Sequence, residues 1–420
     1  EVDSKGWAEF KGDDNLPGGI YLFVLPGKKK YFEFVINEQY FTLKTDKENL
    51  VDNMTIKNSE ENKIFFNYLN FMGERRKKMQ KLKQEKQAFK EQSPKKAENI
   101  QERIDTMNEE ISDKRKQIME EHPNLFYVHV LKAMKKPEVP DEIKNSQDSS
   151  AVLTYYKDHY FDHLDLSDDR FLRTPIFHRK MKTYLKELTL QQPDSIIKAA
   201  EHLIDLTEGN QETFKYIVNY ITYEYERSDI MGMDEVFVHM AENYYLTGQA
   251  DWVDTSQLKE IKKRVIKLKP NLIGKVAPNL TMNTLEGNSR TLHNIDAKAM
   301  VVYFWDSDCG QCQKVTPDLK KIYNKYKDQG VEVYAVNIES KRDGWEEYVN
   351  QKDLNFINVQ DPEGKTKFRR FYNIYSTPVV YVLDEDKKIV AKRIAVKQLK
   401  EILPKVLKGE LSGDSVKDDS

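Results

Sequence analysis

The spacing of hydrophobic and polar positions changes twice along this chain of 420 residues. Residues 6–45 consist of short β-branched and aromatic runs separated by proline and glycine, which predicts a small antiparallel β-module. From about residue 59 to about residue 265, apolar side chains recur at helical spacing and predict an all-α region. After residue 275, apolar runs alternate with amphipathic stretches, as is typical of an α/β domain on a mixed sheet. The pattern therefore predicts a multidomain protein with three kinds of architecture.

Breaks in this pattern give the predicted domain boundaries. We expect the β-module at residues 1–58, the α-helical domain at 59–268 and the α/β domain at 275–408, with the linker LKPNLIGKVAP before the last. The polar residues 409–420 are expected to form a disordered tail. Because the chain opens directly into strand-like sequence, we expect the β-module to be truncated at its N-terminus.

An apolar stripe runs through the first part of the helical region. Ile100, Ile104, Met107, Ile111 and Ile118 recur at spacings of 4, 3, 4 and 7 residues, which resembles a heptad pattern. One interpretation is a coiled-coil arm for homodimerisation or docking. The other is an antiparallel helical hairpin that buries its own stripe, and we favour it because only about three heptads are present.

Composition and charge narrow the classes of function. The 67 basic and 69 acidic residues nearly cancel and no domain is strongly basic, so nucleic acid is not an expected partner. No apolar run approaches the ~20 residues that span a bilayer, so we expect no transmembrane segment. The polar opening EVDSKGWAEF is not a signal peptide, so either an export segment was removed or none existed.

The chain's two cysteines both lie in FWDSDCGQCQ, residues 304–313. Cys309 follows an apolar strand and begins the next helix, where unpaired N–H groups and the helix dipole stabilise a thiolate. Cys312 lies one turn into that helix, so the spacing predicts a pair that cycles between dithiol and disulfide without a cofactor. Zinc would need two further ligands, and a permanent disulfide would close too small a loop to stabilise much. We therefore favour a redox pair and expect no metal.

Residues 275–408 resemble the thioredoxin superfamily, in particular its TlpA/ResA-like branch. VAPNLTMNTLEGNSRTLHNI resembles the opening hairpin of that branch, FWDSDCGQC its Phe-Trp…Cys-x-x-Cys block, and STPVVYVLD its cis-proline loop. The resemblance implies that Cys309 attacks a disulfide and Cys312 resolves the mixed disulfide. It also implies that the bond between Thr377 and Pro378 is cis, and that this loop faces the cysteines and presents backbone groups to a substrate.

The cysteine block departs from the family pattern in three places. Asp308 stands where a tryptophan is usual. Its negative charge opposes formation of the thiolate, so we expect the cysteine pair to have the low reduction potential of a reductant. Gly310-Gln311 replaces the usual dipeptide between the cysteines and does not indicate whether the reduction potential is high or low. Val315 stands where ResA-like members carry a glutamate, but the glutamate of their Val-Asn-x-Glu-Ser motif is retained as Glu339. Glu339 is our candidate proton acceptor for Cys312, the alternative being an ordinary solvated carboxylate at the end of a strand.

Two residues just before the cysteines have other interpretations. Trp305 either packs its ring beside the redox pair or belongs to the core, and needs no chemical role. Asp306 argues against a peroxiredoxin, because that family needs threonine or serine three residues before its reactive cysteine.

The region upstream of residue 275 also resembles known proteins. PGGIYLFVLPGKKKYFEFVINEQYFTL and DLSDDRFLRTPIFHRKM are similar to segments of bacterial envelope proteins in which a β-module and a helical region precede a thioredoxin domain. The resemblance implies a periplasmic or envelope location after removal of an export signal.

These observations predict a thiol–disulfide oxidoreductase, more specifically a reductase of protein disulfides that a separate thiol donor recharges. The alternative is an envelope binding or scaffold protein in which the thioredoxin fold serves mainly interaction.

Overall fold

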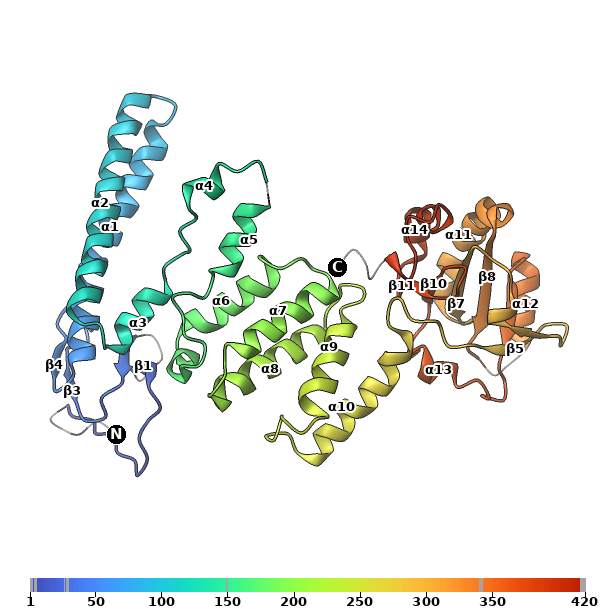
Figure 1. Cartoon of the computed structure of the whole chain (residues 1–420), viewed down its shortest axis with the longest axis horizontal. Coiled ribbons are helices and arrows are strands. Elements are labelled where there is room, and N and C mark those ends of the chain that lie inside the picture. The colour runs from blue at the N-terminus through green and yellow to red at the C-terminus, as the bar shows by residue number, and fades with distance from the viewer. Residues whose placement is uncertain are drawn as a thin grey trace. The chain divides into compact units, whose positions relative to one another are not determined.

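The computed structural model describes Asp3, residues 6–25, Gly27, and residues 30–148, 150–339 and 343–415. The chain divides into two compact units: residues 1–188 with 205–214, and residues 189–204 with 215–420. The predicted fold class is confirmed, since antiparallel strand pairs come first, helices follow, and a mixed sheet occupies the C-terminal part (Figure 1).

The first unit begins with two separate strand pairs. Antiparallel pairs form between β1 (Gly19–Val24) and β2 (Tyr31–Ile36), and between β3 (Thr42–Lys44) and β4 (Thr55–Lys57). Ser59 then caps the first long helix by accepting a hydrogen bond from the N–H of Asn62.

Two long helices, α1 (Glu60–Phe89) and α2 (Pro94–Glu121), lie side by side in an antiparallel hairpin (Figure 1). Ile100 and Ile104 are buried against Leu82 of α1, and Ile118 is buried further along α2. The hairpin interpretation is therefore confirmed. Ile111 of the same stripe is only half-buried.

A buried carboxylate anchors the next helix. Glu61 accepts hydrogen bonds from the backbone N–H groups of Phe126 at 2.5 Å and Tyr127 at 2.9 Å, the first residues of α3 (Phe126–Ala133). Because those N–H groups have no partner inside their own helix, the carboxylate satisfies donors that burial would leave unpaired. The remaining helical elements of this unit are α4 (Asp141–Lys144), α5 (Ala151–Asp158), η1 (Asp169–Arg173) and α6 (Pro175–Lys186).

The helices from residue 193 to residue 271 belong mainly to the second unit. They are α7 (Pro193–Asp205), α8 (Gln211–Glu226), α9 (Asp234–Met240), η2 (Ala241–Tyr245), α10 (Thr255–Leu268) and η3 (Lys269–Asn271). A capping box between Asp254 and Gln257 fixes where α10 begins. Within the described ranges, every helix is too short or too polar to cross a membrane.

Seven strands form the C-terminal sheet in the order β11-β10-β7-β8-β9-β5-β6. The central strands β7, β8 and β9 are parallel, and the outer strands pair antiparallel, so the sheet is mixed as predicted. The strands are β5 (Thr281–Thr284), β6 (Ser289–Thr291), β7 (Ala299–Trp305), β8 (Val331–Asn337), β9 (Ile357–Gln360), β10 (Val379–Leu383) and β11 (Ile389–Lys392). The helical elements around them are η4 (Leu292–Asn294), α11 (Gly310–Tyr326), η5 (Lys327–Gln329), α12 (Asp343–Lys352), α13 (Phe368–Phe371), η6 (Val396–Gln398) and α14 (Leu399–Leu407).

The central strand β7 is buried along its whole length, because both faces of the sheet are covered. Its odd-numbered residues, such as Tyr303 and Trp305, pack with residues of α11, α12 and α14. Its even-numbered residues, such as Phe304, pack with α13 and the segment before β5. A strand covered on both faces reads as a continuous apolar run, which explains the sequence AMVVYFW.

A buried ion pair joins β11 to helices of the second unit. Lys392 is 5% exposed, and its Nζ donates to the Oδ2 of Asp234 at 2.5 Å and to the carbonyl oxygen of Asn271 at 2.8 Å. Burial lowers the pKa of Lys392, while the attraction of Asp234 raises it in part. The pair therefore keeps a charge in a place where an isolated ammonium would be costly.

The expectation of a disordered tail from residue 409 is wrong for residues 409–415. The N–H of Gly413 donates to the Oδ2 of Asp384 at 2.8 Å, and Asp414 pairs with Lys388 at 2.5 Å. These contacts satisfy polar groups at the β10–β11 turn, which the polar composition of the tail did not indicate. Residues 416–420 lie outside the described residues.

Candidate active site

The two cysteines lie where β7 ends and α11 begins. Cys309 is the N-cap of α11, with extended backbone angles, and its N–H donates to the carbonyl oxygen of Asp306 at 3.2 Å. The side chain of Gln313 donates to the carbonyl oxygen of Ser307 at 2.8 Å and closes the same turn. The short connection therefore holds Cys309 at the positive end of the helix dipole.

The sulfur of Cys309 has two hydrogen-bond partners. It accepts from the backbone N–H of Cys312 at 3.2 Å, as a helix-capping atom does. Its thiol donates to the carbonyl oxygen of Thr377 at 3.5 Å, and the bond between Thr377 and Pro378 is cis. A segment 68 residues away along the chain is thus brought against the cysteine pair.

The two thiols are in different electrostatic surroundings, and both are free in this structure. Burial raises the pKa of Cys309, but hydrogen bonds with the side chains of Cys312 and Thr377 and with the N–H groups of Cys312 and Gln311 outweigh it, so the pKa lies below its ordinary value of 9.0. Burial raises the pKa of Cys312 to about 12, and its interaction with Cys309 adds to the rise. Cys309 is partly exposed whereas Cys312 is fully buried, so Cys309 is both the more accessible and the more acidic of the two thiols.

Beneath the pair, a buried hydroxyl network fixes the first turn of α11. The Thr316 hydroxyl donates to the carbonyl oxygen of Cys312 at 2.8 Å. Since that uses its one proton, the Tyr303 hydroxyl donates to Thr316 at 2.9 Å. Trp305 is buried, its ring is stacked on that of Tyr303 with 6.2 Å between the ring centroids, and both residues belong to the core cluster that includes Cys312.

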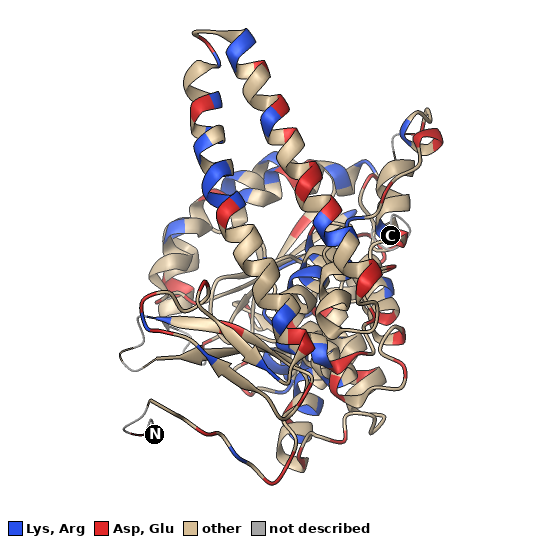
Figure 2. Cartoon of the chain, turned by 90° about the vertical axis from the view of Figure 1, so that its left-hand side faces the viewer, with Lys and Arg blue, Asp and Glu red and all other residues tan. Residues whose placement is uncertain are grey.

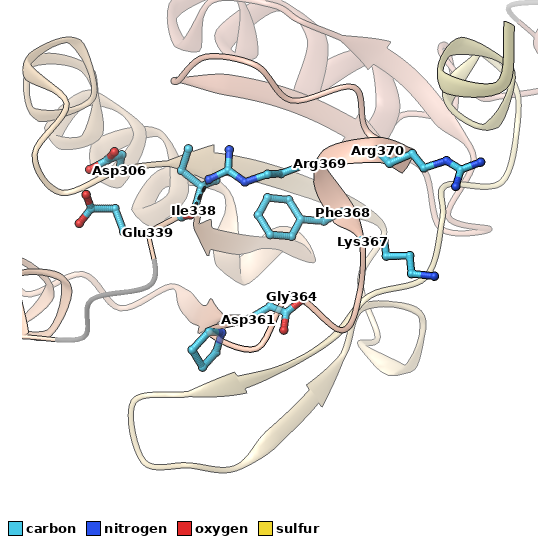
Figure 3. A pocket seen from close by; sticks show the side chains of 10 residues that line it. Asp306, Ile338, Glu339, Asp361, Gly364, Lys367, Phe368, Arg369 and Arg370 are labelled. Carbon is cyan, nitrogen blue, oxygen red and sulfur yellow. Dashed lines mark hydrogen bonds between the residues drawn. The ribbon is translucent and has the colours of Figure 1, made fainter. Parts of the chain in front are cut away.

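A pocket of about 590 Å³ opens beside this turn, and Asp306, Glu339, Asp361 and Arg369 are among its lining residues (Figure 3). Asp306, Glu339 and Asp361 each follow one of the three parallel strands. The carboxyl ends of parallel strands meet at one edge of a sheet, where α/β proteins commonly bind ligands. The fold therefore places a cavity at the sheet edge where Asp306 leads into the turn that carries Cys309.

Glu339 lies on this pocket and is partly buried. Its N–H donates to the Oδ1 of Asn337 at 3.0 Å, and Gln360 donates to its carbonyl oxygen at 2.7 Å. Arg369 donates to the carbonyl oxygen of Ile338 at 2.8 Å, drawn as a dashed line in Figure 3. These bonds hold the backbone that carries Glu339, while Ser340 of the same motif lies outside the described residues.

The residues that depart from the family pattern have different surroundings. Asp308 and Gly310 are exposed, and the N–H of Asp308 donates to the Oδ1 of Asp306 at 2.8 Å. Val315 packs at the edge of the core on the α11 side of the sheet. Among the described residues, no group of three or more histidine, cysteine or acidic side chains is arranged to hold a metal ion.

Sequence reasoning missed three residues that shape the site: Tyr303, Thr316 and Arg369. Thr316 lies four residues after Cys312, so its contact with that residue could have been suspected from helical spacing, whereas Tyr303 lies in the apolar run of β7 and no local pattern links it to Thr316. Arg369 lies far along the chain, and no local pattern links it to Ile338.

Comparison with known proteins supports the assignment of the fold. Residues 273–392 match the AhpC/TSA family, and residues 77–271 match a domain of unknown function, DUF5106. A thiol-disulfide oxidoreductase ResA from Bacillus cereus is 34% identical over 131 residues, which are 31% of this chain and 74% of that protein.

Two solved structures are also similar. A domain of a possible thiol-disulfide isomerase from Cytophaga hutchinsonii is 42% identical and covers 34% of this chain and 97% of its own, with a TM-score of 0.32. A thioredoxin-like protein from Bacteroides caccae is 19% identical and covers 64% of this chain and 97% of its own, with a TM-score of 0.50. The second likeness concerns the fold alone, and its extent includes part of the helical region.

Proposed function

The chain belongs to the ResA-like family of thiol–disulfide oxidoreductases, and from this we propose that Cys309 and Cys312 reduce disulfides of other proteins. The observation that carries the proposal is the asymmetry of the pair. Cys309 is a partly exposed thiol with a lowered pKa, and Cys312 is a buried thiol with a raised pKa.

The proposed reaction has two exchange steps. The Cys309 thiolate attacks one sulfur of the substrate disulfide, a mixed disulfide forms, and the other substrate sulfur leaves as a thiolate. Cys312 then loses its proton and attacks the Cys309 sulfur, which forms the Cys309–Cys312 disulfide and releases the second substrate thiol. Two electrons pass to the substrate, and a separate dithiol must return two electrons to the pair.

The loop of Thr377 and Pro378 is the proposed substrate-binding element. The carbonyl oxygen of Thr377 lies 3.5 Å from the attacking sulfur, and both residues are partly exposed. A substrate segment that pairs with this backbone would bring its disulfide next to Cys309.

Glu339 is the proposed acceptor for the Cys312 proton. A thiol with a pKa of about 12 reacts slowly as a nucleophile unless a base removes its proton. Glu339 lines the pocket that Asp306, three residues before Cys309, also lines, and we propose that a water molecule relays the proton from Cys312 to this carboxylate.

An insulin-reduction assay with dithiothreitol tests the enzymatic role. We expect turnover by the wild type, none above background by Cys309→Ser, and a trapped mixed disulfide with Cys312→Ser. Equal and negligible turnover by the wild type and Cys309→Ser would favour the binding or scaffold function instead. The reduction potential of the pair then tests the direction: a value near ~−270 mV fits a reductant and one near ~−120 mV an oxidant.

The role of Glu339 requires a separate pH profile. We expect Glu339→Gln to slow release of substrate from the mixed disulfide at neutral pH, and the deficit to shrink at high pH where hydroxide replaces the base. Glu347→Gln, an exposed residue of α12 outside the pocket, is the matched control. The same rate and pH profile in Glu339→Gln and in the wild type would exclude the role.

The location and partners follow from the same proposal. We propose a periplasmic or envelope location, where protein disulfides form and persist. Protease protection of the native protein in intact spheroplasts would show a cytosolic location and contradict it. Homodimerisation through the helical region stays a prediction.

A further inference from the structure

The helical hairpin of the first unit forms a groove with α3. The groove has a volume of about 1230 Å³ and is lined by the middle of α1, the second half of α2, and α3 with the segment after it. Its volume exceeds the roughly 300–1,000 Å³ of small-molecule sites. It lies within residues 72–138, outside the redox site.

The groove is strongly cationic. Seven lysine and arginine side chains line it, against one carboxylate, Glu138. Arg76, Lys83, Lys116, Lys135 and Lys136 are exposed, and none of these five forms an ion pair with a described residue. Figure 2 shows Lys and Arg residues, in blue, along the ribbons of both helices of the hairpin. Like charges gathered without partners raise the energy of the free protein, and an anionic ligand relieves that cost.

Two other arginines are held in place and form part of the wall. Arg75 contacts Glu110 at 3.3 Å and lies over the ring of Phe71, and the Nε of Arg115 donates to the Tyr68 hydroxyl at 2.6 Å. These contacts hold Arg75 and Arg115 in the lining of the groove. The other five cations remain available to a ligand.

The apolar side chains of the lining, which we call the floor of the groove, are mostly methionine, and the exposed lysines and arginines are called its rim. Met72, Met79, Ile111 and Met119 line it and are only half-buried, and Met134 is 44% exposed. Ile111 belongs to the apolar stripe of α2, so the hairpin does not cover its own stripe completely. The methionine side chain is flexible, and methionine is enriched on surfaces that bind varied apolar side chains.

An apolar floor below a cationic rim favours one kind of partner. A flat bilayer surface would meet the exposed lysines and arginines and leave the half-buried apolar side chains uncovered. Nucleic acid would neutralise the lysines but offer no apolar side chains to the methionines. A helix with acidic residues on both sides of an apolar stripe satisfies both parts of the groove.

We propose that this groove binds an acidic amphipathic helical segment of a partner protein. The apolar stripe of that segment packs on the methionine floor, and its carboxylates pair with the lysines and arginines of the rim. This docking surface is separate from the redox chemistry and does not depend on it.

Fluorescence anisotropy with the full-length chain tests the proposal. The probe is a labelled model peptide of about 18 residues with leucine along one helical face and glutamate elsewhere. The control peptide has the same composition with its leucines spread around the helix. We expect binding of the first peptide and at least ~10-fold weaker binding of the second, because only the first presents an apolar stripe. Equal affinity for both peptides would overturn the proposal.

Variants separate the groove from general electrostatic attraction. We expect Lys83→Glu/Lys116→Glu to weaken peptide binding at least ~10-fold, and Lys77→Glu/Lys78→Glu, which changes exposed lysines of α1 outside the groove, to weaken it less than ~2-fold. Met119→Gln should weaken binding without changing its dependence on salt, since it removes no charge. If both charge variants weaken binding equally, the attraction is non-specific and the proposal fails.

Two further measurements address other occupants and folding. Thermal melts by circular dichroism show whether each variant folds, and Lys135→Glu/Lys136→Glu in the exposed segment after α3 replaces any variant that does not. If anionic phosphatidylglycerol vesicles bind the wild type while the peptide does not, the surface is a membrane contact and the proposal is wrong. If sedimentation shows a dimer that Lys83→Glu/Lys116→Glu dissociates, the occupant is a second copy and the proposal is likewise wrong.

Discussion

Alkylation of the reduced protein with iodoacetamide is expected to modify Cys309 and spare Cys312. At pH 8 a thiol with a pKa below 9.0 is more than about 10% ionised, whereas one with a pKa of about 12 is about 0.01% ionised. The thiolate fractions therefore differ by at least ~10³-fold. The less acidic thiolate is the stronger nucleophile, and over three pKa units that offsets about 20-fold of the difference. The expected ratio of rates is at least ~50, and the burial of Cys312 increases it.

The assay is a pH series of short iodoacetamide pulses, followed by digestion and mass spectrometry of the peptide that contains both cysteines. The rate at Cys309 should rise through a midpoint below 9.0, and Cys312 should react measurably only after unfolding in guanidinium. The unfolded protein, in which both thiols should react alike, is the control. Modification of Cys312 in the folded protein as fast as Cys309 would refute the assignment of the attacking thiol.

The same two pKa shifts affect stability in opposite directions. Cys312 has a folded-state pKa above its ordinary value, so its contribution to the free energy of unfolding is fully present below pH 9.0. That contribution is lost as the pH rises toward about 12, at about 1.4 kcal/mol per pH unit. Cys309 has a lowered folded-state pKa, so its contribution is complete above 9.0 and is lost as the pH falls through the folded-state value. Urea titrations of the reduced protein between pH 9 and pH 11 should therefore show a loss that Cys312→Ala removes.

Three further changes test the polar contacts of the fold by urea unfolding. Asp234→Asn should lower the free energy of unfolding by about 3–5 kcal/mol, because it leaves the Lys392 ammonium buried beside an amide. Adding Lys392→Met should restore most of that loss, and additive losses in the double variant would contradict the pairing. Thr316→Val should cost about 1–3 kcal/mol by leaving the Tyr303 hydroxyl without an acceptor, and Tyr303→Phe in that background should be nearly neutral; a neutral Thr316→Val would exclude the network. Glu61→Gln should cost about 1–3 kcal/mol because its amide NH₂ faces one of two backbone donors, and unchanged stability would show that α3 needs no such anchor.

Local patterns in the sequence predicted those features that depend on neighbouring residues. The apolar run of β7, the Cys-x-x-Cys turn before α11 and the stripe of α2 all have a period or a spacing that one element can satisfy alone. The antiparallel pairing of α1 and α2 was therefore predictable from the sequence.

The remaining features join distant parts of the chain, and periodicity does not indicate them. Glu61 and Phe126 are 65 residues apart, and Lys392 and Asp234 are 158 residues apart. Each of these residues has the appearance of an ordinary charged or apolar position, and only the folded chain shows which partner it meets. The tail up to residue 415 was mispredicted for the same reason, since its contact with Asp384 lies outside any local pattern.

The cap of α11 links the stability of a helix to the redox potential. The sulfur of Cys309 accepts the N–H of Cys312, and a thiolate is a stronger acceptor than a sulfur already bonded in a disulfide. The cap thus favours the reduced form by an amount of the order of a side-chain cap, about 1 kcal/mol, which corresponds to about 20 mV toward a more oxidising potential. The interval between a typical reductant and a typical oxidant is about 150 mV, or about 7 kcal/mol. The helix end therefore adjusts the potential of the pair, and the direction of electron flow depends on the sum of the other charges and dipoles around the two sulfurs.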